Sequence, residues 1–236
     1  MKHFRLLVFS LSALWINAIG AQDIHYTLFN MSPLTLNPAL TGAYEGTARI
    51  GGIYRDQWAN VISNSFTTPG VYLDAPVIRG FGKKDWVGVG AVNVNDEAGR
   101  FYLQTNISGL SLAYHASLGN STVLTLGLQG TRVQRRVDRQ SAFVRFEDSY
   151  DVSTGGFTNS SQDLTNIREN INYTDINAGL MLRTQLPGEQ LLELGFSGAH
   201  LNAPRYSLLN TSGLNDDGTR RPLRLAMHGR FYTPLN

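Results

Sequence analysis

From Ala48 onward the chain alternates apolar and polar residues in segments that are ten to fifteen residues long, and this pattern most constrains its fold. A period of two indicates β-strands, because successive side chains of a strand point to opposite faces. The segment at 122–136 is the clearest: Leu124, Leu126 and Leu128 alternate with Thr125, Gly127 and Gln129. We expect eight such strands, at Ala48–Trp58, Ser65–Val77, Trp86–Asn95, Phe101–His115, Thr122–Arg136, Asn172–Thr184, Gln190–Leu201 and Pro222–Tyr232.

Strand length separates two all-β architectures. Strands of soluble sandwiches usually have about five or six residues, whereas a tilted strand that crosses a membrane needs about nine to eleven. The predicted strands therefore favour an up-and-down antiparallel transmembrane barrel of the outer-membrane type over a secreted soluble β-sandwich. In one strand the apolar face changes sides after Ile107, and we expect a bulge near Gly109 to cause this.

The connections between the predicted strands alternate in length. Short turns are expected at Ser117–Ser121 and Leu186–Glu189, and long polar loops at Val137–Ile171 and Asn202–Arg221. Short turns on one side and long loops on the other are typical of bacterial outer-membrane barrels.

The first 21 residues predict a signal peptide. Lys2 and Arg5 precede the apolar stretch Leu6–Ile19, which has small residues after it and is too short to cross a hydrocarbon core of about 30 Å as a helix. Residues 22–47 are expected to form a periplasmic N-terminal segment, and residues 48–236 the barrel. Without Lys2 and Arg5 the chain has 18 basic and 18 acidic residues, so its charge does not indicate a nucleic-acid partner.

Few residues suggest a catalytic or metal-binding site. The chain has no cysteine, its five histidines lack the spacing of metal ligands, and no motif of an enzyme is present. We therefore expect no enzymatic activity, no metal and no cofactor. Arg49, Arg55 and Gln57 lie an even number of positions apart on the first strand, and we expect this polar face to point into the lumen because a charge facing lipid costs about 2–4 kcal/mol.

The Asn37-Pro38-Ala39 block predicts a turn. Proline fixes its own φ and biases Asn37 away from the α region, and Gly42 then permits a tight reversal. This segment is expected to tuck under the barrel on the periplasmic side.

Several short motifs resemble the PorP/SprF family of type IX secretion system membrane proteins. The N-terminal matches are Asn30 after Phe29, then Asn37, Pro38, Ala39 and Gly42, and then Arg55 with Gln57 and Trp58; the later ones are Asp96 with Gly99, Asp175 with Gly179, and His200 with Pro204. Family members are usually longer, so the resemblance implies either a chain truncated at its C-terminus or a small barrel.

The resemblance implies a function that composition and periodicity do not reveal. Members lie in the outer membrane and assist the export or surface attachment of particular cargo, including the adhesins of gliding motility. The implied partners are outer-membrane lipid, periplasmic components of the secretion system and an exported surface protein. The alternatives are a general porin or lipid-uptake channel of the same architecture, and the soluble sandwich as a binding module.

Overall fold

The computed structural model describes residues 26, 29–61, 65–81, 84–98, 103–137, 147–158, 161, 166–209 and 219–234. The predicted signal peptide, Gly99 and residues 210–218 lie outside these ranges.

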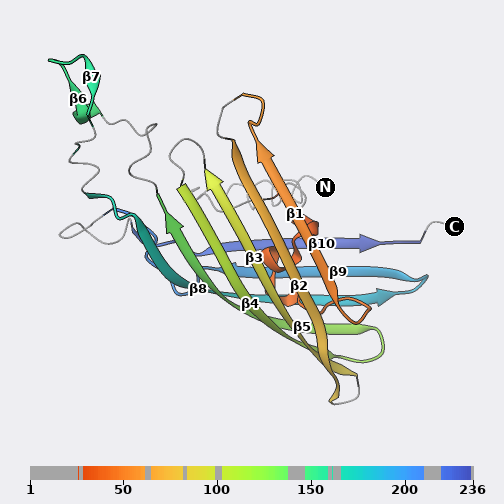
Figure 1. Ribbon diagram of the computed structural model, residues 1–236. Coiled ribbons are helices and arrows are strands. Elements are labelled where there is room, and N and C mark those ends of the chain that lie inside the picture. The colour runs from red at the N-terminus through yellow and green to blue at the C-terminus, as the bar shows by residue number, and fades with distance from the viewer. Residues whose placement is uncertain are drawn as a thin grey trace, which may run out of the picture.

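Eight strands form one sheet in which every neighbouring pair is antiparallel. Their order in space, β1-β2-β3-β4-β5-β8-β9-β10, is their order in the chain, as in an up-and-down barrel. The strands are β1 (Arg49–Gln57), β2 (Phe66–Phe81), β3 (Asp85–Ala98), β4 (Leu103–Ser117), β5 (Thr122–Arg136), β8 (Asn170–Leu186), β9 (Gln190–Ala199) and β10 (Arg224–Tyr232). A separate hairpin, β6 (Tyr150–Asp151) and β7 (Gly156–Phe157), belongs to the connection between β5 and β8 and projects away from the sheet (Figure 1).

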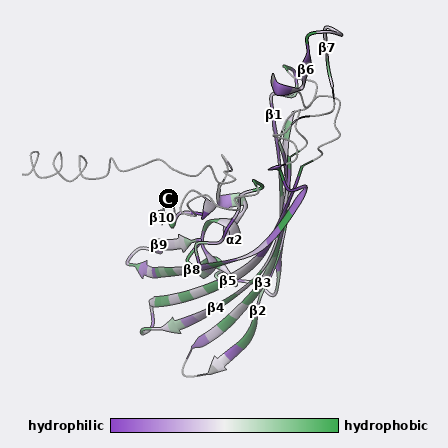
Figure 2. Ribbon diagram, turned by 90° about the vertical axis from the view of Figure 1, so that its left-hand side faces the viewer, coloured by the Kyte–Doolittle hydropathy of each residue, from purple (hydrophilic) through white to green (hydrophobic). Residues whose placement is uncertain are grey.

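The sheet is curled into a half-barrel, with β1 and β10 as its two edges in the described part of the chain (Figures 1 and 2). This confirms the predicted all-β, antiparallel fold of the outer-membrane type. The short turns at 82–84, 118–121 and 187–189 lie at one end of the sheet, and the two long connections, 137–169 and 200–223, lie at the other together with the shorter ones at 58–65 and 99–102. The helices are short: η1 (Phe29–Met31), α2 (Pro33–Leu36), η2 (Pro38–Leu40) and η4 (Glu147–Ser149). Of the residues described, none belongs to a helix with the length and apolar character needed to span a membrane.

The outer face of the sheet is apolar and uncovered. Leu126 and Leu128 of β5 each keep 60% of their surface exposed, whereas Thr125 between the outward leucines is fully buried on the inner face. A β-sandwich would cover these leucines with a second sheet. Within the described residues no such layer exists, so the sandwich alternative is wrong.

The register of β3, β4, β5 and β8 divides their outer face into two zones. Towards the short turns lies an apolar band of three in-register rows: Val87–Tyr114–Leu126–Leu180, Val89–Leu112–Leu128–Ala178 and Ala91–Leu110–Gly130–Ile176. Towards the long connections lies a polar rim of three further rows: Asn93–Ser108–Arg132–Thr174, Asn95–Asn106–Gln134–Asn172 and Glu97–Gln104–Arg136–Asn170. The change from band to rim therefore falls at one level across four strands.

The predicted bulge near Gly109 is wrong. Gly109 pairs in continuous register with Val92 on one side and Thr131 on the other. The apolar face of β4 changes sides because the outer face becomes polar at the rim, while Ile107 on the inner face packs against a core of Tyr26, Leu34, Val92 and Val94. The irregularities of register that the structure shows lie between β2 and β3 instead, at Pro76/Ile78 and Arg79/Phe81.

Candidate functional site

The concave face of the sheet is occupied by residues 29–46, which we call the plug segment (Figure 2). Two of its helical turns, α2 and η2, begin with a proline, Pro33 or Pro38, which suits the first position of a helix because proline lacks an N–H. Asn37 between them is extended, with φ −154° and ψ 120°, and its side chain accepts a hydrogen bond from the Ala39 N–H at 2.9 Å. Gly42 has φ +67°, so the predicted turn and reversal are confirmed.

Glycines of the sheet let the plug segment approach the strands closely. A Cβ added to Gly127 or Gly179 would lie within 3.0 Å of Ala39 or Asn37, and one added to Gly88 would meet the Thr41 carbonyl oxygen. These positions lie on the inner faces of β5, β8 and β3. Larger residues at these positions would push the plug segment away from the strands.

Asn37 links three strands at once. It is fully buried, and its Nδ2 donates to the carbonyl oxygens of Leu180 and Phe196, both at 3.3 Å, and lies 3.1 Å from the Nε2 of His228 on β10. A buried amide that loses such partners pays its full desolvation cost. Asn37 therefore fixes the plug segment to the β8–β10 side of the sheet.

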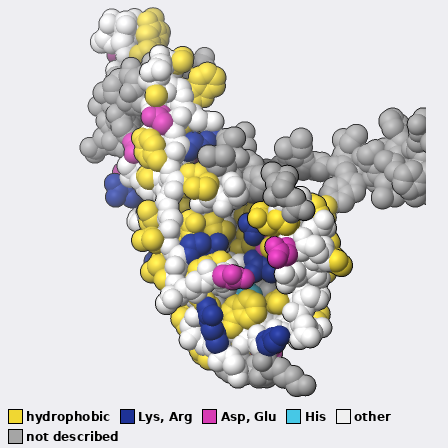
Figure 3. Space-filling model, turned by 90° about the vertical axis from the view of Figure 1, so that its right-hand side faces the viewer, with side chains coloured by type: hydrophobic (Ala, Val, Ile, Leu, Met, Phe, Trp, Pro, Cys, Tyr) yellow, Lys and Arg dark blue, Asp and Glu magenta, His cyan; other side chains and the backbone are white. Residues whose placement is uncertain are grey.

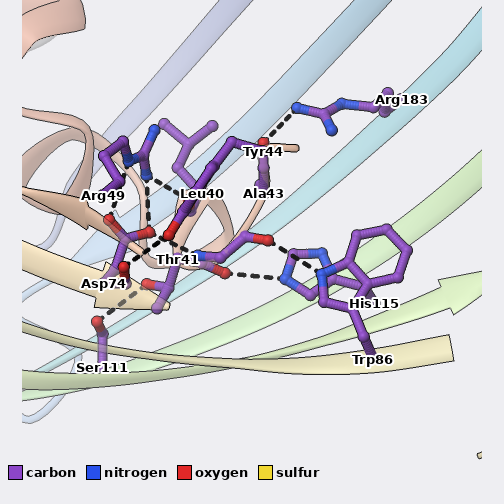
Figure 4. Close-up of polar contacts among 11 residues, drawn as sticks. Leu40, Thr41, Ala43, Tyr44, Arg49, Asp74, Trp86, Ser111, His115 and Arg183 are labelled. Atoms are coloured by element: carbon purple, nitrogen blue, oxygen red, sulfur yellow. Dashed lines mark hydrogen bonds and ion pairs between the residues drawn. The ribbon is translucent and has the colours of Figure 1, made fainter. Parts of the chain in front are cut away.

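Thr41 and Gly42 fix the segment to the opposite side (Figure 4). The Thr41 hydroxyl donates to Ser111 on β4 at 2.9 Å, and its carbonyl accepts from His115 Nε2 at 2.8 Å. This bond places the hydrogen of the imidazole on Nε2, because a carbonyl only accepts. The His115 ring also stacks on Trp86, with 4.4 Å between the ring centroids, and the indole N–H of Trp86 donates to Gly42 O at 3.0 Å.

Asp74 is the charged centre of this contact. Its carboxylate is buried, forms an ion pair with Arg49 at 2.8 Å and accepts from the Gly42 N–H at 2.7 Å. Arg49 donates in addition to Leu40 O at 3.0 Å. A buried carboxylate is tolerated only when it is paired and hydrogen-bonded, so Asp74 ties the plug segment and β1 together.

A second ion-pair network lies nearer the short turns. Glu193 of β9 is buried and pairs with both Arg183 and Arg230, the latter at 2.6 Å. Arg183 also donates to Ala43 O in the plug segment. In the space-filling view, basic and acidic side chains lie next to one another among apolar ones at this end of the molecule (Figure 3).

The other end of the concave face holds a cluster of Asp175, His200 and Arg221. His200 Nδ1 donates to Asp175 Oδ2 at 2.7 Å, and its Nε2 accepts from Arg221 at 3.3 Å, so both ring nitrogens have defined roles. The cluster borders a cavity of about 70 Å³ that Tyr26 also lines. Burial, as the largest cause, and the negative charge of Asp96 raise the pKa of Tyr26 to about 12.

The predicted residues fall at several places. Arg49 contacts the plug segment; Arg55 and Gln57 lie on the same side of β1, half-buried and exposed respectively, and take no part in its ion pair. Asp96 accepts a hydrogen bond from Thr68 at 2.7 Å, and Trp58 directly follows β1 with 60% of its surface exposed. Pro204 is buried, whereas Asn30 is exposed at the start of the plug segment.

The N-terminal segment was predicted to lie on the periplasmic side, under the barrel. Its described part instead lies on the concave face and enters β1 at the end of the sheet that carries the short turns. On which side of the membrane this end lies stays a prediction.

Sequence reasoning missed most of the strand residues that hold the plug segment. Asp74, Ser111 and His115 are single polar residues on inner faces, 32 to 74 positions from their partners in the plug segment. The small or polar row Thr125, Gly127 and Gln129 was the available signal, because small inward residues leave room for an occupant.

The described residues include no group of three or more histidine, aspartate or glutamate side chains that could hold a metal ion. The site therefore consists of hydrogen bonds, ion pairs and close backbone packing by which the strands bind the plug segment.

Comparison with known proteins identifies the family. Residues 18–231 match the model described as type IX secretion system membrane protein PorP/SprF. Comparisons with curated proteins and with solved structures give no match. The motifs that carry the resemblance meet in space, since Asn37 packs on Gly179 and His200 binds Asp175. The chain belongs to the PorP/SprF family of type IX secretion system membrane proteins.

Proposed function

We propose that the protein is a non-enzymatic outer-membrane component of the type IX secretion system that assists the export or surface attachment of a particular cargo, such as a gliding-motility adhesin. The observation that carries this proposal is the family match over residues 18–231. The apolar band supports a location in lipid, because outward rows without a charge suit hydrocarbon. Residues 1–21 would then be the signal peptide for export, and residues 22–47 and the short turns would contact periplasmic components.

The connection between β5 and β8 is the proposed contact for cargo. Its β6–β7 hairpin projects beyond the sheet at the end with the long connections (Figure 1). Val152 at the tip is 85% exposed, and the rings of Tyr150 and Phe157 pack edge to face while each keeps about half its surface exposed. Exposed aromatic and apolar side chains on a projecting hairpin suit a protein partner.

The plug segment weighs against a general porin. It lies on the concave face and is held there by Asn37 on one side and by Asp74 on the other, so the polar inner surface is bound to protein rather than lining a free passage. Large conductance of the purified protein in planar bilayers, with matching solute leakage, would favour the porin instead.

The hairpin can be tested with surface substitutions. We expect the combined change Tyr150→Ser, Val152→Ser and Phe157→Ser to reduce surface display of the cargo, measured by antibody labelling of intact cells. The matched control is Leu118→Ser, which removes an apolar side chain that is 60% exposed in the short turn at the other end of the sheet. Heat-modifiable gel migration checks that both variants fold. Normal cargo display by the hairpin variant would refute this assignment.

The family role is tested separately by affinity purification of the full chain from outer membranes. Secretion-system components and one exported surface protein should co-purify. Recovery of the chain from the soluble fraction, or without any secretion-system component, would contradict the proposal.

A further inference from the structure

The polar rim of the sheet contains a hollow that none of the contacts above uses. The hollow has a volume of about 200 Å³ and is lined by Asn95, Gln104, Asn106, Gln134 and Arg136, from three adjacent strands. All five lie on the outer face by strand alternation, so they point away from the plug segment.

The lining offers hydrogen bonds that the protein itself leaves largely unused. Among the described residues, the side chains of Asn95, Gln104, Gln134 and Arg136 have no hydrogen-bond partner, whereas Asn106 accepts from Ser108 at 3.3 Å. Asparagine and glutamine amides both donate and accept, which suits the hydroxyl groups of a sugar. A guanidinium binds phosphate through two parallel hydrogen bonds.

The position of the hollow limits what can occupy it. The hollow lies in the two rim rows nearest the long connections. The row Asn93–Ser108–Arg132–Thr174 separates it from the apolar band. A lipid whose acyl chains lay along Leu110 and Leu128 would therefore carry its headgroup at the level of Arg132 and the hollow. The rim carries two arginines against one acid, Glu97, in its twelve residues, so an anionic headgroup is favoured.

We propose that this hollow, together with Arg132 between it and the apolar band, binds the phosphorylated sugar headgroup of a membrane glycolipid. Arg132 and Arg136 hold phosphate, and the amides of Asn95, Asn106 and Gln134 hold sugar hydroxyls. This inference rests on the proposed outer-membrane location, with the long connections facing outward.

The test uses the full chain purified in detergent micelles and native mass spectrometry. The probes are diphosphoryl lipid A, its dephosphorylated form, phosphatidylethanolamine and inorganic phosphate. We expect one lipid A molecule to bind saturably. The double change Arg132→Gln and Arg136→Gln should weaken this binding by at least about tenfold, the loss expected when even one charge-assisted hydrogen bond is removed. The control Arg79→Gln with Lys84→Gln removes two exposed cations at the opposite end of the sheet and should leave binding unchanged.

A second variant, Gln134→Glu, should weaken binding by placing a negative charge next to the phosphate, and it keeps the test valid should the arginine variant fail to fold. Equal lipid A binding by a folded rim variant and the control would overturn the proposal. So would equal affinity for phosphatidylethanolamine, or binding of inorganic phosphate alone. Loss of cargo display with unchanged lipid A binding would assign the rim to a protein partner instead. Because cargo display and lipid binding are measured separately, failure of the secretion role leaves this result interpretable.

Discussion

The two faces of β5 alternate along the strand but differ in polarity and in burial. Outward, Leu126 and Leu128 are largely exposed and contact no other layer of the described protein. Inward, Thr125 is fully buried, Gln129 donates to Leu34 O at 2.9 Å, and Gly127 lies against the backbone of the plug segment. In a soluble sheet the apolar row would be the buried one. The reversal is consistent with an outer-membrane barrel, in which lipid takes the place of a core on one face, while a segment of the same chain covers the other.

The strongest test of this difference is a charge in the apolar band. Leu126→Arg should lower the free energy of unfolding by about 2–4 kcal/mol if the residue lies near the middle of the bilayer. Gln134→Arg places the same charge on the same face of β5 but in the polar rim, and should change stability by less than about 0.5 kcal/mol. Urea titrations of the protein folded into lipid vesicles measure both. Similar stability of the two variants would mean that the band does not face hydrocarbon.

The inward face is tested by filling the space that a glycine leaves. Gly127→Val should destabilise the protein by about 1–3 kcal/mol through overpacking, because its Cβ would meet Ala39. Gly130→Val is the matched control on the outer face, where an added Cβ meets nothing within 4 Å.

Displacement of the plug segment can be read directly. The chain has no cysteine, so Ala43→Cys, at a position only 4% exposed, introduces a single reporter. A water-soluble thiol reagent should label it slowly in the native background and much faster with Gly127→Val. Unchanged protection would show that the segment does not depend on the glycine.

A loss of stability similar to that of Gly127→Val is expected when the Asn37 amide, which joins three strands, is removed. Asn37→Ala should cost about 1–3 kcal/mol, since it removes the Nδ2 donor from the Leu180 and Phe196 carbonyls and from His228. Asn30→Ala, at the exposed start of the segment, should be neutral within about 0.5 kcal/mol. Hydrogen exchange of β10 amides checks the mechanism: exchange should accelerate in the Asn37 variant alone, and equal exchange in both variants would argue against the link to His228.

The strands were predictable because alternation is a local property. The bounds of β5 agree with the sequence prediction at both ends, and those of the other strands differ by a few residues. The change of apolar face in β4 was visible in the sequence but was misread as a bulge, since a change of environment from band to rim gives the same pattern as an extra residue.

The candidate site was predictable only in part. The turn at Asn37 and Pro38 follows from proline chemistry, and the inward position of Arg49 follows from the cost of a charge in lipid. The partners of these residues could not be predicted, because Asp74, His115 and His228 come from strands whose distance from the plug segment depends on the curvature of the whole sheet.

The central claim is that one row of each strand faces lipid while the other faces the plug segment. Single cysteines placed in turn at residues 124–126 and 128–131 of the protein in lipid vesicles test it most directly, with a lipid-soluble and a water-soluble thiol reagent. Gly127 is left unchanged because an added Cβ would meet the plug segment. We predict that the lipid-soluble reagent labels positions 124, 126, 128 and 130, and that positions 125, 129 and 131 are protected from both. Equal labelling of the two rows, or labelling of the leucine positions by the water-soluble reagent, would contradict the account.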